Sequence, residues 1–490
     1  MQKMGGWPEV IMVKYAGINK ALKEFKDKKI HAGKATIGEL INTAADINIK
    51  LSDIIIAESM IQTGWNINEF FDRVLHVFNH NLRALELGLK EGHSFLLDRV
   101  ARDLNESSIK SGAVLDDIFI NKSIIYTLAT EVGNHEMGLQ PAAGTGDSCP
   151  YTGLLRALIE NESDLEKVKR GISVLLKVST IFRSGKTTTG CNMEGYGAGS
   201  TATAACLAEV AEGTPKQIEH AMVLALSPTI AVPCTPRVMV PGLCANHIAS
   251  AITTGNNAAK IALNSSMRVN VDIDAMISMA AEVHKKAAPI ITEINVKWMR
   301  PYFNKNEDID KWVDSEVLSE ERKSAADIKK ESSEYMRNII KNSPPIDNPF
   351  GDVVVGGSSM AVGSPTNMGR IVHELLEGEI EEIKIELTYD LFVRRAINVP
   401  GILMGVVFGA KTNDIEAYKK VVNYVKGKGI KVTINKVDVP EIQRLFVRTN
   451  CGRYMLDSRN RGGGRITIID AAPSKEMAIK EAKKLGIVIV

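Results

Sequence analysis

Residues 190–213 read GCNMEGYGAGSTATAACLAEVAEG, and most side chains in this segment are small. The same character extends over residues 134–263, which are rich in Gly, Ala, Ser and Thr and poor in charge. Helices that carry small side chains can approach one another closely. The segment therefore predicts a tightly packed helical bundle around a buried site. The simpler alternative is an Ala-rich helical core without a site.

Helical patterns occur on both sides of this segment. In residues 36–100 apolar residues recur at helical spacing, and Asn66 or Asn68 is placed to cap the helix that contains FFDRVLHVF. Further helices are predicted over residues 115–133, 200–213 and 245–263. Two loops rich in Gly or Pro interrupt them, at residues 141–153 and 233–244. We expect one large, mostly helical domain over residues 1–300.

The pattern changes after residue 300. Residues 301–348 are dense in Lys, Asp, Glu and Ser, which predicts a charged linker of solvated helices followed by a turn. Residues 349–490 alternate between amphipathic helices, such as residues 414–429, and short strands. Strands are predicted at residues 379–391, 430–437, 443–449 and 465–470 and at the C-terminal end. The predicted fold class is α+β, with a large mostly α-helical domain followed by a smaller α/β domain.

The composition excludes several classes of protein. Of the 490 residues, 44% are hydrophobic and 24% are charged, with a formal net charge of +2. This balance gives no reason to expect a nucleic-acid or membrane-surface partner. No segment approaches the ~20 apolar residues of a membrane span, and the first residues lack the pattern of a signal peptide. We expect a soluble cytoplasmic protein that acts on a small molecule.

Cysteines are the residues most suggestive of chemistry. The chain has six: Cys149, Cys191, Cys206, Cys234, Cys244 and Cys451. A disulfide framework is not expected in a chain of this kind. Cys191, Cys234 and Cys244 lie in the small-residue region close to Gly or Pro, which lets the backbone approach a bound group. Iron–sulfur clusters normally use four cysteines, so three would leave one iron free as a Lewis acid. Spacing alone leaves open both a cluster and three buried structural thiols.

Several motifs resemble those of the iron–sulfur L-serine dehydratases. The segment GCNMEGYG (190–197) is similar to the Gly-Cys-x-x-Glu-x-Gly motif of that family, and a later cysteine pair follows it. NHEMG (134–138) and PAAGTGDSCPYTGLLRAL (141–158) resemble its Asn-x-x-Met-Gly motif and its glycine loop. VVGGSSMAVGSPTNMGRIVHEL (354–375) looks like the start of its β domain, and the glycines at 462–464 match the glycine run near the end of that domain. The chain thus resembles the α and β portions of the family fused in one polypeptide.

The resemblance carries an activity and a cofactor with it. It implies a [4Fe-4S] cluster held by Cys191, Cys234 and Cys244. It also implies a lyase, an L-serine ammonia-lyase, which eliminates water and then ammonia from a β-hydroxy amino acid such as L-serine and leaves a 2-oxo acid. Such a reaction serves amino-acid degradation and gluconeogenesis. We also expect a homodimer.

The elimination needs a base to remove the α-proton of the substrate. Candidate catalytic residues are His135, His247, Glu194 and Asp147. The two histidines sit beside the motif loops and titrate near working pH. Either histidine could instead be a hydrogen-bonded core or surface residue, and Glu194 could instead support the surroundings of the cluster.

The loop at 144–148 precedes a helix, whose free backbone N–H groups suit a substrate carboxylate. Candidate substrate-binding residues are Gly144, Thr145, Gly146, Ser148 and Lys186. The alternatives are an ordinary capped loop and, for Lys186, a surface charge.

Two segments depart from the family pattern. Residues 360–362 (MAV) and 396–398 (AIN) stand where the family has histidine-containing segments. We therefore expect the substrate preference to depart from serine. Elimination of a thiol from a cysteine-like compound is one alternative activity, and a non-catalytic iron–sulfur sensor on the same scaffold is another. The sequence leaves open the substrate, the identity of the base, the oligomeric state and the role of Cys149.

Overall fold

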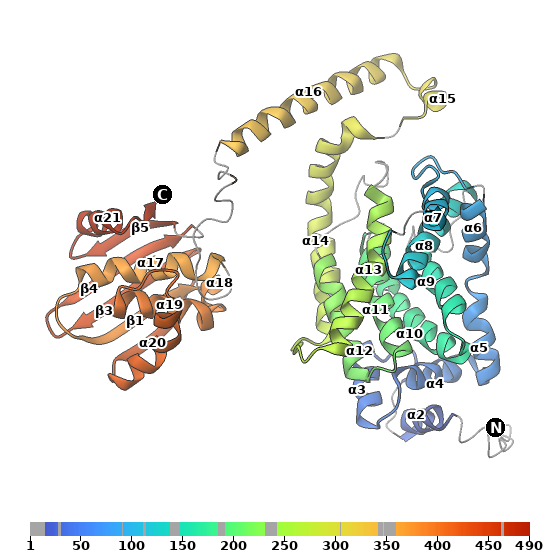
Figure 1. Ribbon diagram of the computed structural model, residues 1–490, viewed down its shortest axis with the longest axis horizontal. Helices are drawn as coiled ribbons and strands as arrows, with labels where there is room; N and C mark the ends of the chain where they lie inside the picture. The colour runs from blue at the N-terminus through green and yellow to red at the C-terminus, as the bar shows by residue number, and fades with distance from the viewer. Residues whose placement is uncertain are drawn as a thin grey trace. The chain divides into compact units, whose positions relative to one another are not determined.

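The chain forms two compact units, Met1–Arg337 and Asn338–Val490. The computed structural model describes residues 15–27, 31–90, 92–110, 114–137, 148–184, 192–230, 243–303, 305–341, 346, 359–461 and 465–490. The first unit is helical, and the second contains a six-stranded sheet with helices (Figure 1). The predicted α+β class, with a large helical part followed by a smaller α/β part, is confirmed.

The described helices that precede the sheet unit begin and end as follows. The α-helices are α2 (Ala16–Asp27), α3 (Ile37–Asp46), α4 (Leu51–Thr63), α5 (Ile67–His76), α6 (Asn79–Lys90), α7 (Val100–Lys110), α8 (Ile118–Met137), α9 (Ser148–Asn161), α10 (Leu165–Ser184), α11 (Gly199–Val210), α12 (Pro215–Leu226), α13 (Leu243–Asn264), α14 (Ile273–Met299), α15 (Glu307–Asp310) and α16 (Ser315–Ile340). A π-helix, η1 (Asn192–Ala198), and two 3₁₀ turns, η2 (Ser227–Thr229) and η4 (Arg300–Tyr302), complete them. The helices predicted from apolar periodicity are confirmed.

The start of α5 illustrates how local sequence sets these boundaries. The Asn66 side chain accepts hydrogen bonds from the backbone N–H groups of Asn68 and Glu69, at 2.9 and 3.1 Å. The Glu69 carboxylate accepts in return from the backbone N–H of Asn66, at 2.8 Å. This reciprocal capping box satisfies backbone donors that have no partner within the helix. Of the two predicted caps, Asn66 is the one used.

Small residues allow unusually close helix packing in the bundle. A Cβ atom added at Gly88 of α6 would lie 2.0 Å from the carbonyl oxygen of Ala129 on α8, and one added at Gly133 of α8 would lie 1.9 Å from that of Ala84 on α6. Between α13 and α11, a Cβ at Gly255 would lie 2.7 Å from the Ser200 carbonyl oxygen. No side chain larger than hydrogen fits at these crossings. The helices therefore approach as closely as the small-residue sequence predicts.

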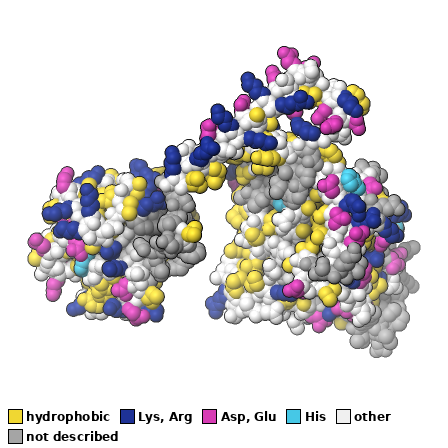
Figure 2. All heavy atoms as spheres, turned by 45° about the horizontal axis from the view of Figure 1, so that its top comes forward, with side chains coloured by type: hydrophobic (Ala, Val, Ile, Leu, Met, Phe, Trp, Pro, Cys, Tyr) yellow, Lys and Arg dark blue, Asp and Glu magenta, His cyan; other side chains and the backbone are white. Residues whose placement is uncertain are grey.

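Charged side chains cover the described surface in a mixed pattern. On the face shown in Figure 2, Lys and Arg side chains are interspersed with Asp and Glu over both units, in line with the net charge of +2. In α16, which lies in the segment predicted as a charged linker, Ile328 is the one buried residue. None of the described helices combines the length and the apolar character that crossing a membrane requires.

The second unit is built on one mixed sheet. Its strands are β1 (Ile380–Thr388), β2 (Lys431–Val437), β3 (Ile442–Thr449), β4 (Arg453–Asn460), β5 (Arg465–Ala472) and β6 (Val488–Ile489), in the order β2-β1-β3-β4-β5-β6. The β1–β2 and β5–β6 pairs are parallel, and the other pairs are antiparallel. Its helices are α17 (Ser359–Leu375), α18 (Tyr389–Phe392), α19 (Arg395–Phe408), α20 (Ile415–Gly427) and α21 (Lys475–Lys484).

Strand β4 is an element that the sequence pattern did not predict. Its sequence, RYMLDSRN, carries Arg, Asp, Ser and Asn rather than a simple apolar alternation. Ser458 nevertheless faces the interior, where its hydroxyl lies 3.2 Å from the Met368 sulfur on α17. A buried polar residue that finds a partner only in the folded state hides the strand from periodicity analysis.

Glycine also sets the crossing of α17 and α19 in the second unit. A Cβ at Gly405 would lie 2.4 Å from the carbonyl oxygen of Thr366 and 2.9 Å from the backbone nitrogen of Arg370. Backbone atoms cannot move aside as the end of a flexible side chain can. The two helices therefore have to separate if this position gains a side chain.

Gly405→Ala is expected to destabilise the second unit by about 1–3 kcal/mol, the usual cost of overpacking a well-packed contact. Urea unfolding of the full-length chain, with hydrogen exchange of the β3 amides to assign the transition, measures the change. Gly427→Ala is the matched control, because a Cβ there meets nothing within 4 Å. It should leave the stability unchanged or raise it by up to about 1 kcal/mol. Equal effects of the two substitutions would contradict the packing argument.

Candidate active site

The elements that flank the three candidate cysteine ligands meet at η1. This π-helix begins directly after Cys191 and contacts α9, α10, α13 and η2. The turn η2 ends at Thr229, shortly before Cys234, and α13 begins at Leu243, next to Cys244. π-helices are rare and are frequently found at functional sites. Segments far apart in the sequence thus converge on one part of the bundle.

A pair of aromatic rings joins two of these segments. The rings of Tyr196 in η1 and His247 in α13 have centroids 5.0 Å apart and planes inclined at 62°, an edge-to-face arrangement. The Tyr196 hydroxyl lies 3.3 Å from the Thr254 hydroxyl, also on α13. These contacts fix η1 against the first three turns of α13. In the sequence, η1 directly follows Cys191, and α13 begins one residue before Cys244.

A chain of buried polar side chains runs from α8 to α9 and α6. The Cys149 thiol on α9 donates to the Glu131 carboxylate on α8, with sulfur and oxygen 2.8 Å apart. The Asn134 side-chain amide donates to the Cys149 sulfur at 3.6 Å and to the Asn81 side-chain oxygen on α6 at 3.3 Å. The Asn134 side-chain oxygen lies 3.2 Å from Nε2 of His80. The network ties together three helices through side chains that are otherwise costly to bury.

His135 stands at the end of this network. Its Nε2 lies 3.2 Å from Oε1 of Glu131, one helical turn earlier, and its Nδ1 is buried without a hydrogen-bond partner among the described residues. Burial alone lowers the pKa of His135, but the hydrogen bond and the negative charge of Glu131 outweigh it, and the pKa lies above its ordinary value of 6.5. An imidazole that is held through one nitrogen and open at the other can accept or donate a proton. The arrangement is suited to general acid–base chemistry.

Comparison with known proteins agrees with this architecture. The family model described as "Serine dehydratase alpha chain" matches residues 49–297, just over half of the chain. A protein of Bacillus subtilis (strain 168), "Probable L-serine dehydratase, alpha chain", is 28% identical over 263 residues, which cover 49% of this chain and 83% of that protein.

The chain belongs to the serine dehydratase alpha-chain family. Membership indicates a lyase of the serine dehydratase type. All the elements that meet at η1, and the polar network around His135 and Glu131, lie within the matched residues. The sheet-containing unit lies outside the match, so its likeness to a β domain remains a prediction.

The structure describes the predicted site residues to different extents. His135 and His247 have described side chains, and Ser148 is the first residue of α9. Glu194 lies in η1 and Cys244 in α13, but the structure describes only their backbone. The predicted site residues outside the described parts of the chain are Cys191, Cys234, Asp147, Gly144, Thr145, Gly146 and Lys186. Among side chains that are described, no three His, Cys, Asp or Glu residues gather as ligands for a metal ion.

Glu131 and Asn134 were not singled out by sequence reasoning. Glu131 lies four residues before His135 in the segment IIYTLATEVGNHEM, where it is the one acid among mostly uncharged residues before the histidine. An acid and a histidine at this spacing face each other on a helix, so the pair could have been predicted. The part played by Cys149 could not, because it depends on how α9 packs against α8.

Glu131→Gln is expected to lower the pKa of His135, because it removes the negative charge that favours the imidazolium form. Titration of the histidine ring signals by NMR measures the shift. Glu136→Gln is the matched control: it removes a neighbouring acid that contacts the His93 backbone N–H and not His135. An unchanged pKa of His135 in the Glu131 variant would contradict the proposed pairing.

The same substitution should also change how stability depends on pH. The folded-state pKa of His135 is raised, so the pair stabilises the fold fully below the unfolded pKa and loses this contribution as pH rises through the folded pKa. The free energy of unfolding that separates the natural chain from Glu131→Gln should therefore be larger near about pH 5.5 than near about pH 9. A free-energy difference that increased with pH would contradict a raised pKa of His135 in the folded state.

Proposed function

We propose that the chain is a [4Fe-4S]-dependent ammonia-lyase that acts on a β-hydroxy amino acid, with the cluster held by Cys191, Cys234 and Cys244. The observation that carries the proposal is the convergence at η1 of the elements flanking all three cysteines. Three thiolates match an iron–sulfur cluster that lacks one protein ligand. We further propose that the protein works in the cytoplasm as a homodimer.

When bound, such a cluster would supply a Lewis acid for the β-hydroxyl of the substrate. The remaining chemistry falls to side chains of the chain. We assign the general base to His135, whose buried Nδ1 has no hydrogen-bond partner among the described residues and could take the α-proton while Glu131 holds Nε2. Loss of the α-proton and of the β-hydroxyl as water leaves an enamine. The enamine rearranges to an imine and hydrolyses to a 2-oxo acid and ammonia without further help.

The other candidate residues surround this centre. His247 is held edge-on by Tyr196, which favours a positioning role beside η1 over proton transfer. Glu194 and Asp147 remain alternative bases. For the substrate carboxylate we propose Gly144, Thr145 and Gly146 with Ser148, beside the N-terminus of α9, whose helix dipole favours negative charge. Lys186 would add a positive charge to the same subsite.

Replacing Cys191, Cys234 or Cys244 by Ser is expected to abolish the brown colour and the broad visible absorbance of a cluster. The measurement follows anaerobic reconstitution with iron and sulfide, together with an assay for ammonia release. Cys206→Ser is the matched control, because Cys206 is fully buried in α11 and burial raises the pKa of its thiol, which disfavours the thiolate that a metal requires. Full cluster content in all three variants would refute the ligand assignment.

The substrate is expected to differ from serine. Residues 360–362 (MAV) and 396–398 (AIN) lie at the starts of α17 and α19, and neither segment has the histidine of the family pattern. Asn398 is fully buried, and its amide donates to the Leu391 carbonyl oxygen at 3.0 Å, so that amide hydrogen is engaged within the unit. A site that lacks a needed hydrogen-bond partner can disfavour a polar substrate by factors as large as ~10⁴.

A panel of L-serine, L-threonine, L-cysteine and larger analogues, compared by kcat/KM on the reconstituted enzyme, tests this expectation. A larger or less polar hydroxy amino acid should exceed L-serine. Preference for L-cysteine would indicate thiol elimination, and a bound cluster without turnover of any compound would indicate a sensor. A kcat/KM for L-serine near the highest in the panel would refute this expectation and indicate an ordinary L-serine dehydratase.

A further inference from the structure

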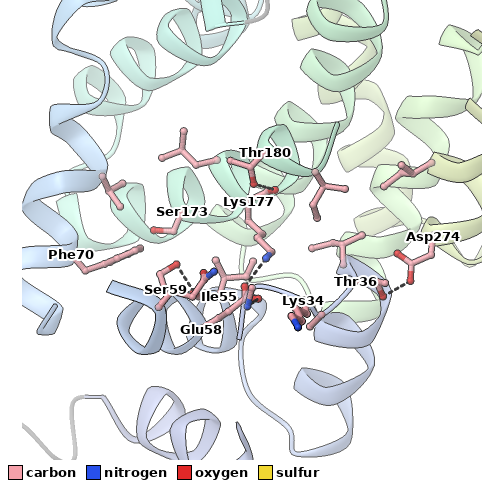
Figure 3. Close-up of a pocket in the computed structure, with 18 of the residues that line it drawn as sticks. Lys34, Thr36, Ile55, Glu58, Ser59, Phe70, Ser173, Lys177, Thr180 and Asp274 are labelled. Atoms are coloured by element: carbon pink, nitrogen blue, oxygen red, sulfur yellow. Dashed lines mark hydrogen bonds and ion pairs between the residues drawn. The ribbon is translucent and has the colours of Figure 1, made fainter. Parts of the chain in front are cut away.

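A cavity of about 640 Å³ opens in the helical unit, and its described lining includes none of the candidate active-site residues. Its wall is formed by the segment that leads into α3 and by α4, α5, α10 and α14 (Figure 3). Pockets for small molecules typically measure ~300–1,000 Å³. The cavity is therefore large enough for a ligand of its own.

An ion pair of low exposure lies on the wall of this cavity. The Lys177 ammonium on α10 is 2.6 Å from the Glu58 carboxylate on α4, and the two side chains are 15% and 1% exposed. The other Glu58 oxygen accepts a hydrogen bond from the backbone N–H of Gly33 at 2.9 Å. A buried ion pair contributes little net stability compared with apolar residues of the same volume, because both charges lose their hydration. Its position on a cavity wall therefore points to binding.

A second acid and a second base contribute to the same cavity. The Asp274 carboxylate on α14 accepts from the Thr36 hydroxyl at 2.6 Å and from the backbone N–H of Gly38 at 3.1 Å, and Lys34 also lines the space. Figure 3 shows Asp274 and the Glu58–Lys177 pair at separate places in the cavity. The four charges sum to zero. A ligand with a single charge would meet groups of its own sign, whereas one that carries both signs is matched at both ends.

The uncharged lining completes the chemical description. The hydroxyls of Ser59 and Ser173 donate to the backbone carbonyls of Ile55 and Lys169, so what remains for a ligand is their acceptor lone pairs. Acceptor oxygens beside the Glu58 carboxylate suit an ammonium group. Much of the remaining wall is apolar, formed by Phe70, Val74, Leu176, Ile181 and Ile277. These side chains suit a branched aliphatic group.

We propose that this cavity is a second small-molecule site, which binds a free α-amino acid with an apolar side chain. The ammonium group of the ligand lies at Glu58 and the serine hydroxyls, its carboxylate lies at Lys177 and Lys34, and its side chain lies against Phe70 and its neighbours. The site needs neither the cluster nor turnover. It is therefore independent of the proposed lyase reaction.

Isothermal titration calorimetry of the full-length chain tests the ligand class. The probe is L-leucine, and the matched compounds are 4-methylpentanoate, which lacks the ammonium group, and 3-methylbutylamine, which lacks the carboxylate. L-leucine should bind with one site per chain, and each compound with a single charge should bind at least about tenfold more weakly, the change that ~1.4 kcal/mol produces. Absence of L-leucine binding at millimolar concentration, or equal binding of the three compounds, would overturn the proposal.

Substitutions then locate the binding. Lys177→Met and Glu58→Gln should each weaken L-leucine binding at least about tenfold. Lys167→Met is the matched control on the same helix, since Lys167 pairs with Glu162 outside the cavity lining. If Lys177→Met does not fold, Glu58→Gln carries the test, because glutamine keeps the shape and can accept from Gly33. His135→Gln should bind L-leucine normally; loss there, with normal binding in the cavity variants, would move the site to the active centre and overturn the proposal.

Discussion

The reciprocal contact of Gly88 on α6 with α8 and of Gly133 on α8 with α6 sets the distance between these helices, and the polar residues of the candidate active site depend on that distance. A side chain at either glycine would overlap a backbone carbonyl of the other helix. Helices with ordinary side chains at their contact pack about 8–10 Å apart. A wider separation would draw Asn134, which directly follows Gly133, away from its partner Asn81. The absence of two side chains therefore allows a buried hydrogen-bond network to close.

The hydrogen bonds within the network determine which of its polar atoms are occupied. Toward α6, Asn134 is hydrogen-bonded to Asn81 and His80, and toward α9 the Glu131 carboxylate is occupied by Cys149. A buried network whose members are satisfied is rigid, and removal of one member leaves the others with an unmet cost of about 1–3 kcal/mol. Among the described residues, Nδ1 of His135 has no hydrogen-bond partner, and His135 lies near the C-terminal end of α8. The same contacts that hold the helices together thus hold one titratable side chain in place, a few residues along the chain from the segment where a substrate is proposed to bind.

The sequence predicts those features of the structure that local interactions determine. Apolar periodicity predicts the helices of residues 36–100, and the capping pattern limits the start of α5 to two asparagines, of which Asn66 is used. Small residues predict close packing because their effect does not depend on which helix is the partner. The α+β class follows from the change of period after residue 350.

Features that depend on contacts between segments far apart in the sequence could not be predicted from it. Strand β4 was not predicted because the place of Ser458 in the interior depends on Met368 on α17 and on the Gln443 carbonyl oxygen on β3, which are distant in the sequence. The Glu58–Lys177 pair joins α4 to α10, and neither segment by itself shows which residue of the other helix is the partner. The sequence leaves the role of Cys149 open, because its hydrogen bond to Glu131 exists only where α9 lies along α8. Chemistry that arises from tertiary packing has no signature in a single segment.

The π-helix η1 shows how local sequence and packing combine at the proposed cluster site. Within η1, Gly195 and Gly197 flank Tyr196, whose side chain contacts His247 and Thr254 on α13. Where η1 passes into α11, the hydroxyls of Ser200 and Thr201 donate to the carbonyls one turn earlier, at 2.6 and 2.7 Å. Such back-bonding satisfies carbonyls at a change of helix type and bends the axis. The part of η1 that packs against α13, and its passage into α11, are therefore shaped by glycines, an aromatic ring and hydroxyls.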